Sequence, residues 1–247
     1  MNIKTLAYIP LHYGSPYLDA VIRSIDDHVD KILILYTSTP SYGQKQGLKN
    51  PDNRQQLYDI AHAASSKIEW VEVPPMGQEN RHRQMVFNYS NGYDLIMAVD
   101  SDEIFDDVEE MKEAAMKTNS KTVNVGGDRW WHFWRSFNEC NRDGFYPTRF
   151  HVVGGTDQNP APIIHVGKIY HMGYALPENL TRYKISVHGH KDILNTWIHN
   201  KWINYKRGVT KLLHPDSQTV WIETEPFDKT TLPQILKDHP YYNSEKI

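Results

Sequence analysis

Cysteine is nearly absent from this sequence. The 247 residues contain one cysteine, Cys140, so no internal disulfide can form. With no histidine base beside it in the sequence, Cys140 is interpreted as chemically inert. No apolar run approaches the length of a membrane span, and residues 1–10 hold too short an apolar segment for a signal peptide. A cytoplasmic location is therefore expected.

Several familiar catalytic motifs are missing as well. The chain has no glycine-rich phosphate loop of either common pattern, which argues against a P-loop ATPase and against a dinucleotide-dependent oxidoreductase. It also lacks a Gly-x-Ser-x-Gly nucleophile elbow and a His-Glu-x-x-His zinc motif. The chemistry must therefore come from other residues.

The charges are unevenly distributed along the chain. The content of 39% hydrophobic and 23% charged residues, with a net charge of −3, indicates a soluble globular protein with a real core. Residues 1–127 contain 12 Lys and Arg against 18 Asp and Glu, whereas residues 128–214 contain 12 against 6. A basic, aromatic-rich segment after an acidic one favours an anionic ligand held between them, although solvated surface gives the same pattern.

Short apolar runs alternate with helical patterns in the first half. The sequence predicts strands at 4–9, 31–36, 67–73, 95–99 and 122–125, and helices at 17–27, 55–66, 79–91 and 107–118. This alternation is typical of an α/β fold with a mainly parallel sheet and right-handed crossovers. Such a sheet binds its ligands at the C-terminal ends of the strands.

The predicted strand at 95–99 ends on a group of carboxylates. Asp100 and Asp102 are spaced i, i+2 and Glu103 lies beside them. Hard divalent cations such as Mg²⁺ or Mn²⁺ take oxygen ligands and leave sites open for substrate phosphates, so both aspartates are candidate metal ligands. The alternative is an acidic turn before a helix whose N-terminus favours Asp106 and Asp107.

Other loops should reach the same edge of the sheet. The segments 10–13, 37–38 and 80–83 follow predicted strands, as the acidic motif does. Arg81 and Arg83 would suit a diphosphate, because guanidinium groups bind phosphate oxygens in pairs. The alternative for both arginines is a solvated first helical turn.

Residues 129–135 read Arg-Trp-Trp-His-Phe-Trp-Arg and follow the fifth predicted strand. If this segment is a strand, Trp130, His132 and Trp134 share one face. We expect that face to line an acceptor site, because rings stack on sugars or bases and histidine adds a titratable donor. The alternative is that these rings belong to the core.

The chain resembles the nucleotide-sugar-dependent glycosyltransferases of the GT-A fold, in the large family 2-like group. The resemblance over residues 3–118 rests on Ala7-Tyr8-Ile9-Pro10, Tyr17-Leu18, Ser24-Ile25, Val29-Asp30-Lys31-Ile32, Asn80-Arg81, Gly92-Tyr93-Asp94-Leu95 and Asp100-Ser101-Asp102-Glu103. A weaker similarity to bacterial and phage members involves the segments from Ile169 to Tyr174, Tyr183-Lys184, Phe227 and His239-Pro240.

The resemblance implies a Rossmann-like GT-A domain that transfers a sugar from a nucleotide-diphosphate sugar, most often a UDP-sugar, to an acceptor hydroxyl. It implies a nucleotide-sugar-binding half at 1–127 and an irregular, aromatic-rich acceptor-binding half at 128–247. Mn²⁺ or Mg²⁺ would be held by Asp100, Asp102 and His171. The donor would contact Ile9, Pro10, Tyr13, Thr37, Arg81, Arg83, Asp100 and Ser101. Asp102 would act in catalysis, and the catalytic base remains open among Glu139, Asp143 and Asp157.

The acceptor is not identified by the sequence. A glycan, a lipid-linked acceptor and a polymer all remain open, as does a hydroxylated base in DNA, which the isoelectric point near 6.5 does not favour. A sugar-phosphate nucleotidyltransferase uses similar metal chemistry, but its glycine-rich first loop is replaced here by His12-Tyr13-Gly14-Ser15. A protein that binds nucleotide sugars without turnover is a further alternative.

Overall fold

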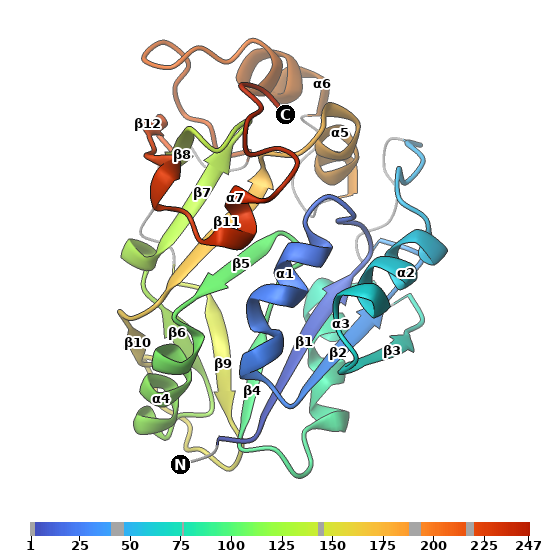
Figure 1. Cartoon of the computed structure of the whole chain (residues 1–247), viewed down its shortest axis with the longest axis vertical. Coiled ribbons are helices and arrows are strands. Elements are labelled where there is room, and N and C mark those ends of the chain that lie inside the picture. The colour runs from blue at the N-terminus through green and yellow to red at the C-terminus, as the bar shows by residue number, and fades with distance from the viewer. Residues whose placement is uncertain (1–2, 41–46, 76, 143–145, 188–193, 216–219) are drawn as a thin grey trace.

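The computed structural model describes residues 3–40, 47–75, 77–142, 146–187, 194–215 and 220–247. Two sheets organise these residues (Figure 1). The larger has seven strands in the order β10 (Ile163–Ile164), β6 (Val123–Val125), β9 (Thr148–Val152), β4 (Leu95–Ala98), β1 (Thr5–Leu11), β2 (Lys31–Tyr36) and β3 (Ile68–Glu72). Most neighbouring strands are parallel, and β9 runs antiparallel to both β4 and β6.

The second sheet continues from the upper end of the first in Figure 1. Its order is β12 (Glu225–Pro226), β8 (Glu139–Asn141), β7 (Trp130–Trp134), β11 (Lys168–Tyr174) and β5 (Glu103–Asp106). Strand β11 is antiparallel to β5 and parallel to β7. Its register places His171 between Glu103 on one side and His132 on the other.

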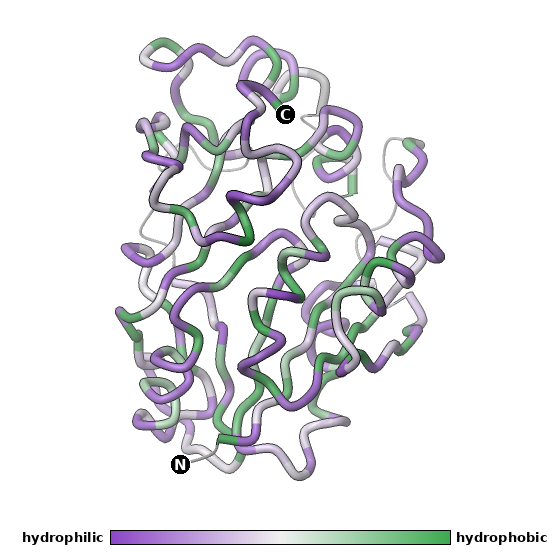
Figure 2. The backbone as a smooth tube through the Cα atoms, in the orientation of Figure 1, coloured by the Kyte–Doolittle hydropathy of each residue, from purple (hydrophilic) through white to green (hydrophobic). Residues whose placement is uncertain are grey.

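Helices cover both faces of the larger sheet. On one face, α1 (Leu18–Ile25), α2 (Arg54–Ala64) and α4 (Val108–Thr118) share a core with the strands. Helix α1 buries Leu18, Val21, Ile22 and Ile25, which lie at helical spacing on one side. On the other face, α3 (Glu79–Gln84) and the 3₁₀ turn η2 (Met85–Tyr89) cover a smaller cluster around Tyr8 and Ile96. Figure 2 shows hydrophobic residues along the central strands.

The remaining helical segments lie mainly around the second sheet. They are α5 (Glu178–Val187), α6 (Leu194–Trp197), the π-helical turn η4 (Ile198–Ile203), α7 (Gln234–Lys237) and the short turns η1 (Asp26–His28), η3 (Gly127–Arg129) and η5 (Lys229–Thr231). A separate core of aromatic rings forms there around Trp134, Tyr174, Trp197, Trp202 and Trp221. Among the described residues, no helix is both long enough and apolar enough to cross a membrane.

The predicted α/β fold class is confirmed. Every strand and helix predicted in residues 1–127 has a counterpart, although the predicted helix 79–91 is the short α3 followed by the 3₁₀ turn η2. The segment after the acidic motif differs. Residues 103–106 form strand β5 rather than an acidic turn, because they pair with β11 of the second sheet. Each sheet also contains strands from both sides of residue 127. Strands β9 and β10 come after this residue and join the larger sheet, whereas β5 comes before it and joins the smaller one.

Candidate functional site

The Asp-x-Asp motif forms the short connection between the two sheets. Asp100 follows β4, and the chain enters β5 at Glu103. The loop after β1 packs directly on this connection, since the Ser101 hydroxyl donates to the Tyr13 carbonyl at 2.9 Å. Gly14 makes that approach possible: its φ is +136°, and a Cβ there would lie 2.5 Å from Ser101 Oγ. The loops after β1 and β4 therefore meet, as the sequence predicted.

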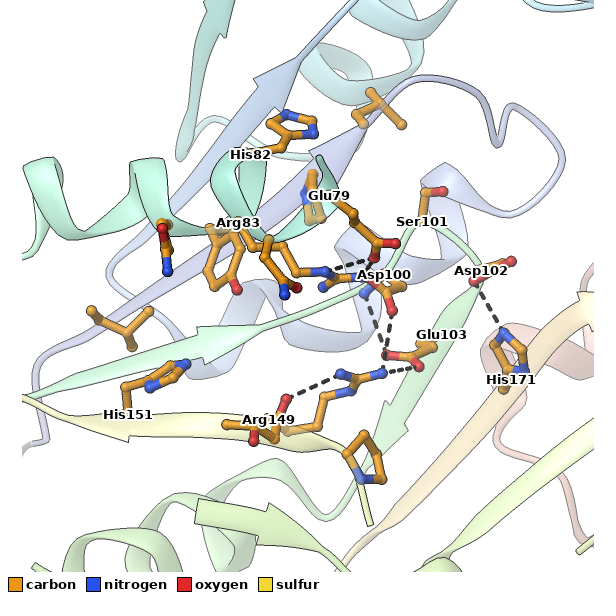
Figure 3. A pocket seen from close by; sticks show the side chains of 18 of the residues that line it. Glu79, His82, Arg83, Asp100, Ser101, Asp102, Glu103, Arg149, His151 and His171 are labelled. Atoms are coloured by element: carbon orange, nitrogen blue, oxygen red, sulfur yellow. Dashed lines mark hydrogen bonds and ion pairs between the residues drawn. The ribbon is translucent and has the colours of Figure 1, made fainter. Parts of the chain in front are cut away.

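Asp100 is held by two arginines. Arg83 on α3 donates to Oδ1 at 2.6 Å, and Arg149 on β9 donates to Oδ2 at 3.2 Å (Figure 3). Arg83 also donates to Glu79, one turn earlier on its helix, at 2.8 Å. Burial alone raises the pKa of Asp100, but the two guanidinium groups outweigh it and hold this pKa well below its usual range. Asp100 is therefore a fixed anion.

Glu103 is completely buried and shares Arg149 with Asp100. The Arg149 guanidinium donates to Glu103 Oε1 at 2.5 Å and lies over the Trp130 ring, 5.1 Å from its centroid. Burial raises the pKa of Glu103, and Arg149 opposes that rise without cancelling it. Arg149 is thus enclosed by two carboxylates and an aromatic ring, and its removal would leave Glu103 buried without a counter-charge.

Asp102 faces a lysine and a histidine. Lys184 on α5 donates to its Oδ2 at 2.9 Å, and His171 Nε2 lies 3.5 Å from its Oδ1. The other ring nitrogen of His171, Nδ1, is 2.8 Å from Nδ1 of His132. Burial lowers the pKa of His171 to about 3. The imidazole is therefore neutral near pH 7, the form in which histidine binds metals.

A glycine leaves room for these two side chains. A Cβ at Gly173 would lie 2.4 Å from Nε2 of His171 and 2.5 Å from Nζ of Lys184. Gly173 follows His171 by two residues on β11, so its missing side chain opens the space through which His171 and Lys184 reach Asp102. Any larger residue at position 173 would push at least one of them away.

The charged groups line one cavity of about 1310 Å³. It collects eleven of the residues that the sequence predicted for the site: Pro10, Tyr13, Thr37, Arg83, Asp100, Ser101, Asp102, Trp130, His132, Asp157 and His171. They come from the ends of β1, β2 and β4, from α3, from β7 and β11 of the second sheet and, for Asp157, from the loop after β9. The cavity therefore lies where the two sheets meet.

The other predicted site residues lie elsewhere. Ile9 is fully buried in the main core, and Arg81 is exposed on the outside of α3. Trp134 is 1% exposed and stacks on Tyr174 in the aromatic core, because the second sheet has a core on both of its sides. Glu139, on β8, accepts a hydrogen bond from the Thr224 hydroxyl, away from the residues that line the cavity. Asp143 lies outside the described residues.

Sequence reasoning missed two central cations, Arg149 and Lys184. Arg149 comes from β9, which was not predicted, and it reaches the site only because β9 inserts beside β4. Lys184 belongs to the Tyr183-Lys184 pair that carried part of the resemblance. The sequence therefore marked this position, but it did not indicate that the lysine pairs with Asp102. His12 was also missed: its ring bridges the Thr37 carbonyl and the Tyr183 hydroxyl at 2.7 Å each.

The residues present suit a divalent cation in part. Asp102 Oδ1 and His171 Nε2 face each other at 3.5 Å on the cavity wall and supply one carboxylate and one neutral imidazole. Within the described ranges, no group of three or more His, Cys, Asp or Glu side chains is arranged to hold a metal. A site of this kind would be completed by ligand phosphates, as is usual for Mg²⁺.

Comparison with known proteins gives distant similarities. No protein-family model and no curated protein matches the chain. Among solved structures, the chain is similar to S. aureus TarS, with 10% identity and a TM-score of 0.42, over 82% of this chain and 43% of that one. It is also similar to glucosyl-3-phosphoglycerate synthase from Mycobacterium tuberculosis in complex with Mn²⁺, UDP-glucose and phosphoglyceric acid.

The match to the synthase has 15% identity and a TM-score of 0.34, over 54% of this chain and 44% of that one. A UDP-glucose pyrophosphorylase complexed with UDP-glucose is similar at 9% identity with a TM-score of 0.32, over 68% and 74% of the two chains. The chain spans less than half the length of the TarS and synthase chains. At these identities the similarity concerns the fold alone.

Proposed function

We propose that this chain is a metal-dependent glycosyltransferase that moves a sugar from a nucleotide-diphosphate sugar, with a UDP-sugar as the first choice, to an acceptor hydroxyl. The observation that carries this proposal is the pairing of Asp102 with neutral His171 on a cavity wall that also presents Arg83 and Arg149. Two metal donors beside two guanidinium groups suit a metal-bound diphosphate. The resemblance in residues 3–118 supports the same reading.

The donor would lie along the C-terminal ends of β1, β2 and β4. Pro10, Tyr13 and Thr37 would contact the nucleoside, because they line the cavity beside the acidic motif. Arg83 is held by Glu79 and Asp100, so its guanidinium is already oriented before a ligand arrives. An oriented cation loses little side-chain freedom when it binds a phosphate, which favours diphosphate recognition.

Asp102 and His171 would hold Mn²⁺ or Mg²⁺, and Asp100 is the third proposed ligand. When bound, the metal would stabilise negative charge on the departing nucleotide. The two oxygens of Asp100 already accept hydrogen bonds from Arg83 and Arg149, so this carboxylate would have to serve the metal and the two arginines together. His132 would orient His171 through the contact between their Nδ1 atoms. Residues that hydrogen-bond to a metal-binding histidine commonly have this role.

The acceptor would approach from the second sheet. Trp130 and His132 line the cavity on β7, so we retain them as acceptor-binding residues, whereas the enclosed Trp134 is better placed to support Tyr174. Of the proposed catalytic bases among the described residues, Asp157 lines the cavity, but it follows Val152, which pairs with Leu95 at the start of β4, whereas the acidic motif follows the end of that strand. Asp157 pairs there with Lys121 at 2.9 Å. General-base action would require Asp157 to exchange this lysine for the acceptor hydroxyl.

A screen of nucleotide sugars with Mn²⁺ or EDTA tests the proposed function. A ligand present at 100 times its Kd stabilises the folded state by about 2.7 kcal/mol, so the right donor should raise the melting temperature by several degrees. Slow hydrolysis of that donor should depend on the metal. Failure of every nucleotide sugar to shift the melt or to be hydrolysed would reject the proposal, and a shift without hydrolysis would indicate a binding protein.

His171→Ala is expected to weaken Mn²⁺ binding about 10- to 100-fold or more while changing the melting temperature little, because His171 faces the cavity. Isothermal titration with Mn²⁺ and a thermal melt give the two values. His165→Ala is the matched control, since His165 lies on the surface beside Asp128. Normal Mn²⁺ binding together with a much lower melting temperature would make His171 a structural residue.

A further inference from the structure

Lys184 is a buried cation whose ammonium group lies in the cavity. Its side chain is 7% exposed and donates to Asp102 at 2.9 Å, and the side chain of Asp102 is 12% exposed. Lysine is rarely buried at all unless a counter-charge holds it. The buried ammonium pairs with Asp102, the same carboxylate that would bind the metal. A purely structural ion pair would not need this position.

The surrounding residues are arranged to admit this lysine. Gly173 leaves the space that Nζ of Lys184 occupies, since a Cβ there would be 2.5 Å away. The Tyr174 ring lies beneath the ammonium, with its centroid 5.0 Å from Nζ. A tyrosine face stabilises a partly desolvated cation without neutralising it, so the charge of Lys184 remains available to a second anion.

Three cations beside the acidic motif differ in how their charge is shared. Arg83 forms ion pairs with both Glu79 and Asp100, and Arg149 forms ion pairs with both Asp100 and Glu103. Lys184 pairs with Asp102. An ammonium has three hydrogen-bond donors on a flexible stem, whereas the two arginines are fixed by bonds to two carboxylates each. Lys184 is therefore the cation best able to change partner.

We propose that Lys184 is the resident cation of Asp102: it neutralises this carboxylate when no metal is bound, and it transfers to a phosphate oxygen of the nucleotide diphosphate when the metal takes Asp102. The diphosphate part rests on the proposed function. Two positive groups that share one carboxylate repel each other, so Lys184 weakens metal binding to the empty protein. A diphosphate removes that repulsion by binding both, so metal and nucleotide bind cooperatively.

The experiment compares Lys184→Met with the wild type in two titrations. Mn²⁺ without nucleotide should bind the variant about tenfold more tightly, because its competitor is gone. UDP in the presence of saturating Mn²⁺ should bind it about tenfold more weakly, because the charge-assisted hydrogen bond from Lys184 to phosphate is lost. Lys184→Arg should stay near the wild type in both. Lys112→Met is the matched control, since Lys112 is equally buried but pairs with Glu109 on α4.

The outcomes separate this proposal from the proposed function. Mn²⁺ binding that is unchanged or weaker in Lys184→Met would overturn the role of Lys184 and leave the metal site in place. If neither protein binds Mn²⁺ or UDP, both proposals fail. Should Lys184→Met not fold, Lys184→Gln keeps a hydrogen bond to Asp102 without the charge, and the same two titrations on it decide the question.

Discussion

Asp102→Asn is expected to remove metal-dependent turnover, with a fall of roughly 10²-fold to 10³-fold or more, because the carboxylate that faces His171 is lost. The substitution preserves shape, and an amide is a poor ligand for a hard divalent cation. The fold should persist with reduced stability, because the amide oxygen can still accept from the buried Lys184 ammonium but no longer balances its charge. Donor hydrolysis with Mn²⁺ measures the loss, and a thermal melt verifies folding.

Asp100→Asn is the informative companion variant. Its two oxygens accept from Arg83 and Arg149, so the change should weaken donor binding through the arginines as well as any direct metal contact. Mn²⁺ titration of both variants ranks the two carboxylates as ligands. Wild-type turnover in Asp102→Asn, or full activity of the wild type in excess EDTA, would eliminate the metal assignment.

Arg149→Met should destabilise the fold by about 3–5 kcal/mol, because it strands the carboxylate of Glu103 in the interior without its partner. Adding Glu103→Gln removes that charge and should recover most of the lost stability. Urea unfolding of the two single variants and the double variant measures the coupling. A double variant no more stable than Arg149→Met would show that the loss comes from packing against Trp130 instead.

The Arg149→Met penalty should grow with pH. Burial raises the pKa of Glu103, and the variant loses the group that opposes this rise. A carboxyl whose folded pKa exceeds its unfolded value binds its proton more tightly in the folded state, so it stabilises at low pH and loses that stabilisation as the pH rises. The difference from the wild type should be smallest near pH 4.5 and larger at pH 8. A penalty that is independent of pH would exclude an uncompensated carboxylate.

The order of strands and helices in the first half could be predicted because each element is apolar on its own period. In helix α1 and in strands β1, β2 and β4, the residues that are buried in the structure are apolar and follow one another at the spacing of the element, so a short window of sequence is enough to recognise each one. Strand β5 could not be predicted, because Glu103–Asp106 contains two carboxylates in four residues and becomes a strand only through its pairing with β11. Local pattern and tertiary pairing disagree there, and the pairing prevails.

The site was predictable where a residue follows a strand in sequence, as Asp100, Asp102, Tyr13 and Thr37 do. Arg149 and Lys184 could not be placed, because a single cation on a strand or helix carries no local signal. Trp130 and His132, which were predicted to share one face of β7, both line the cavity. Alternation alone could not reveal that the end of that strand enters a second core.

The insertion of β9 between β4 and β6 governs when the site can form during folding. Ile96 pairs with His151 and Met97 with Phe150, so one edge of β4 is completed only by a strand that lies about fifty residues later in the chain. Long-range pairings of this kind form slowly, because the intervening chain must first be closed into a loop. A fragment cut at residue 127 would retain both aspartates but expose β4 as a bare apolar edge, which promotes aggregation. The acidic motif therefore reaches its final surroundings only together with the later segment that carries Arg149.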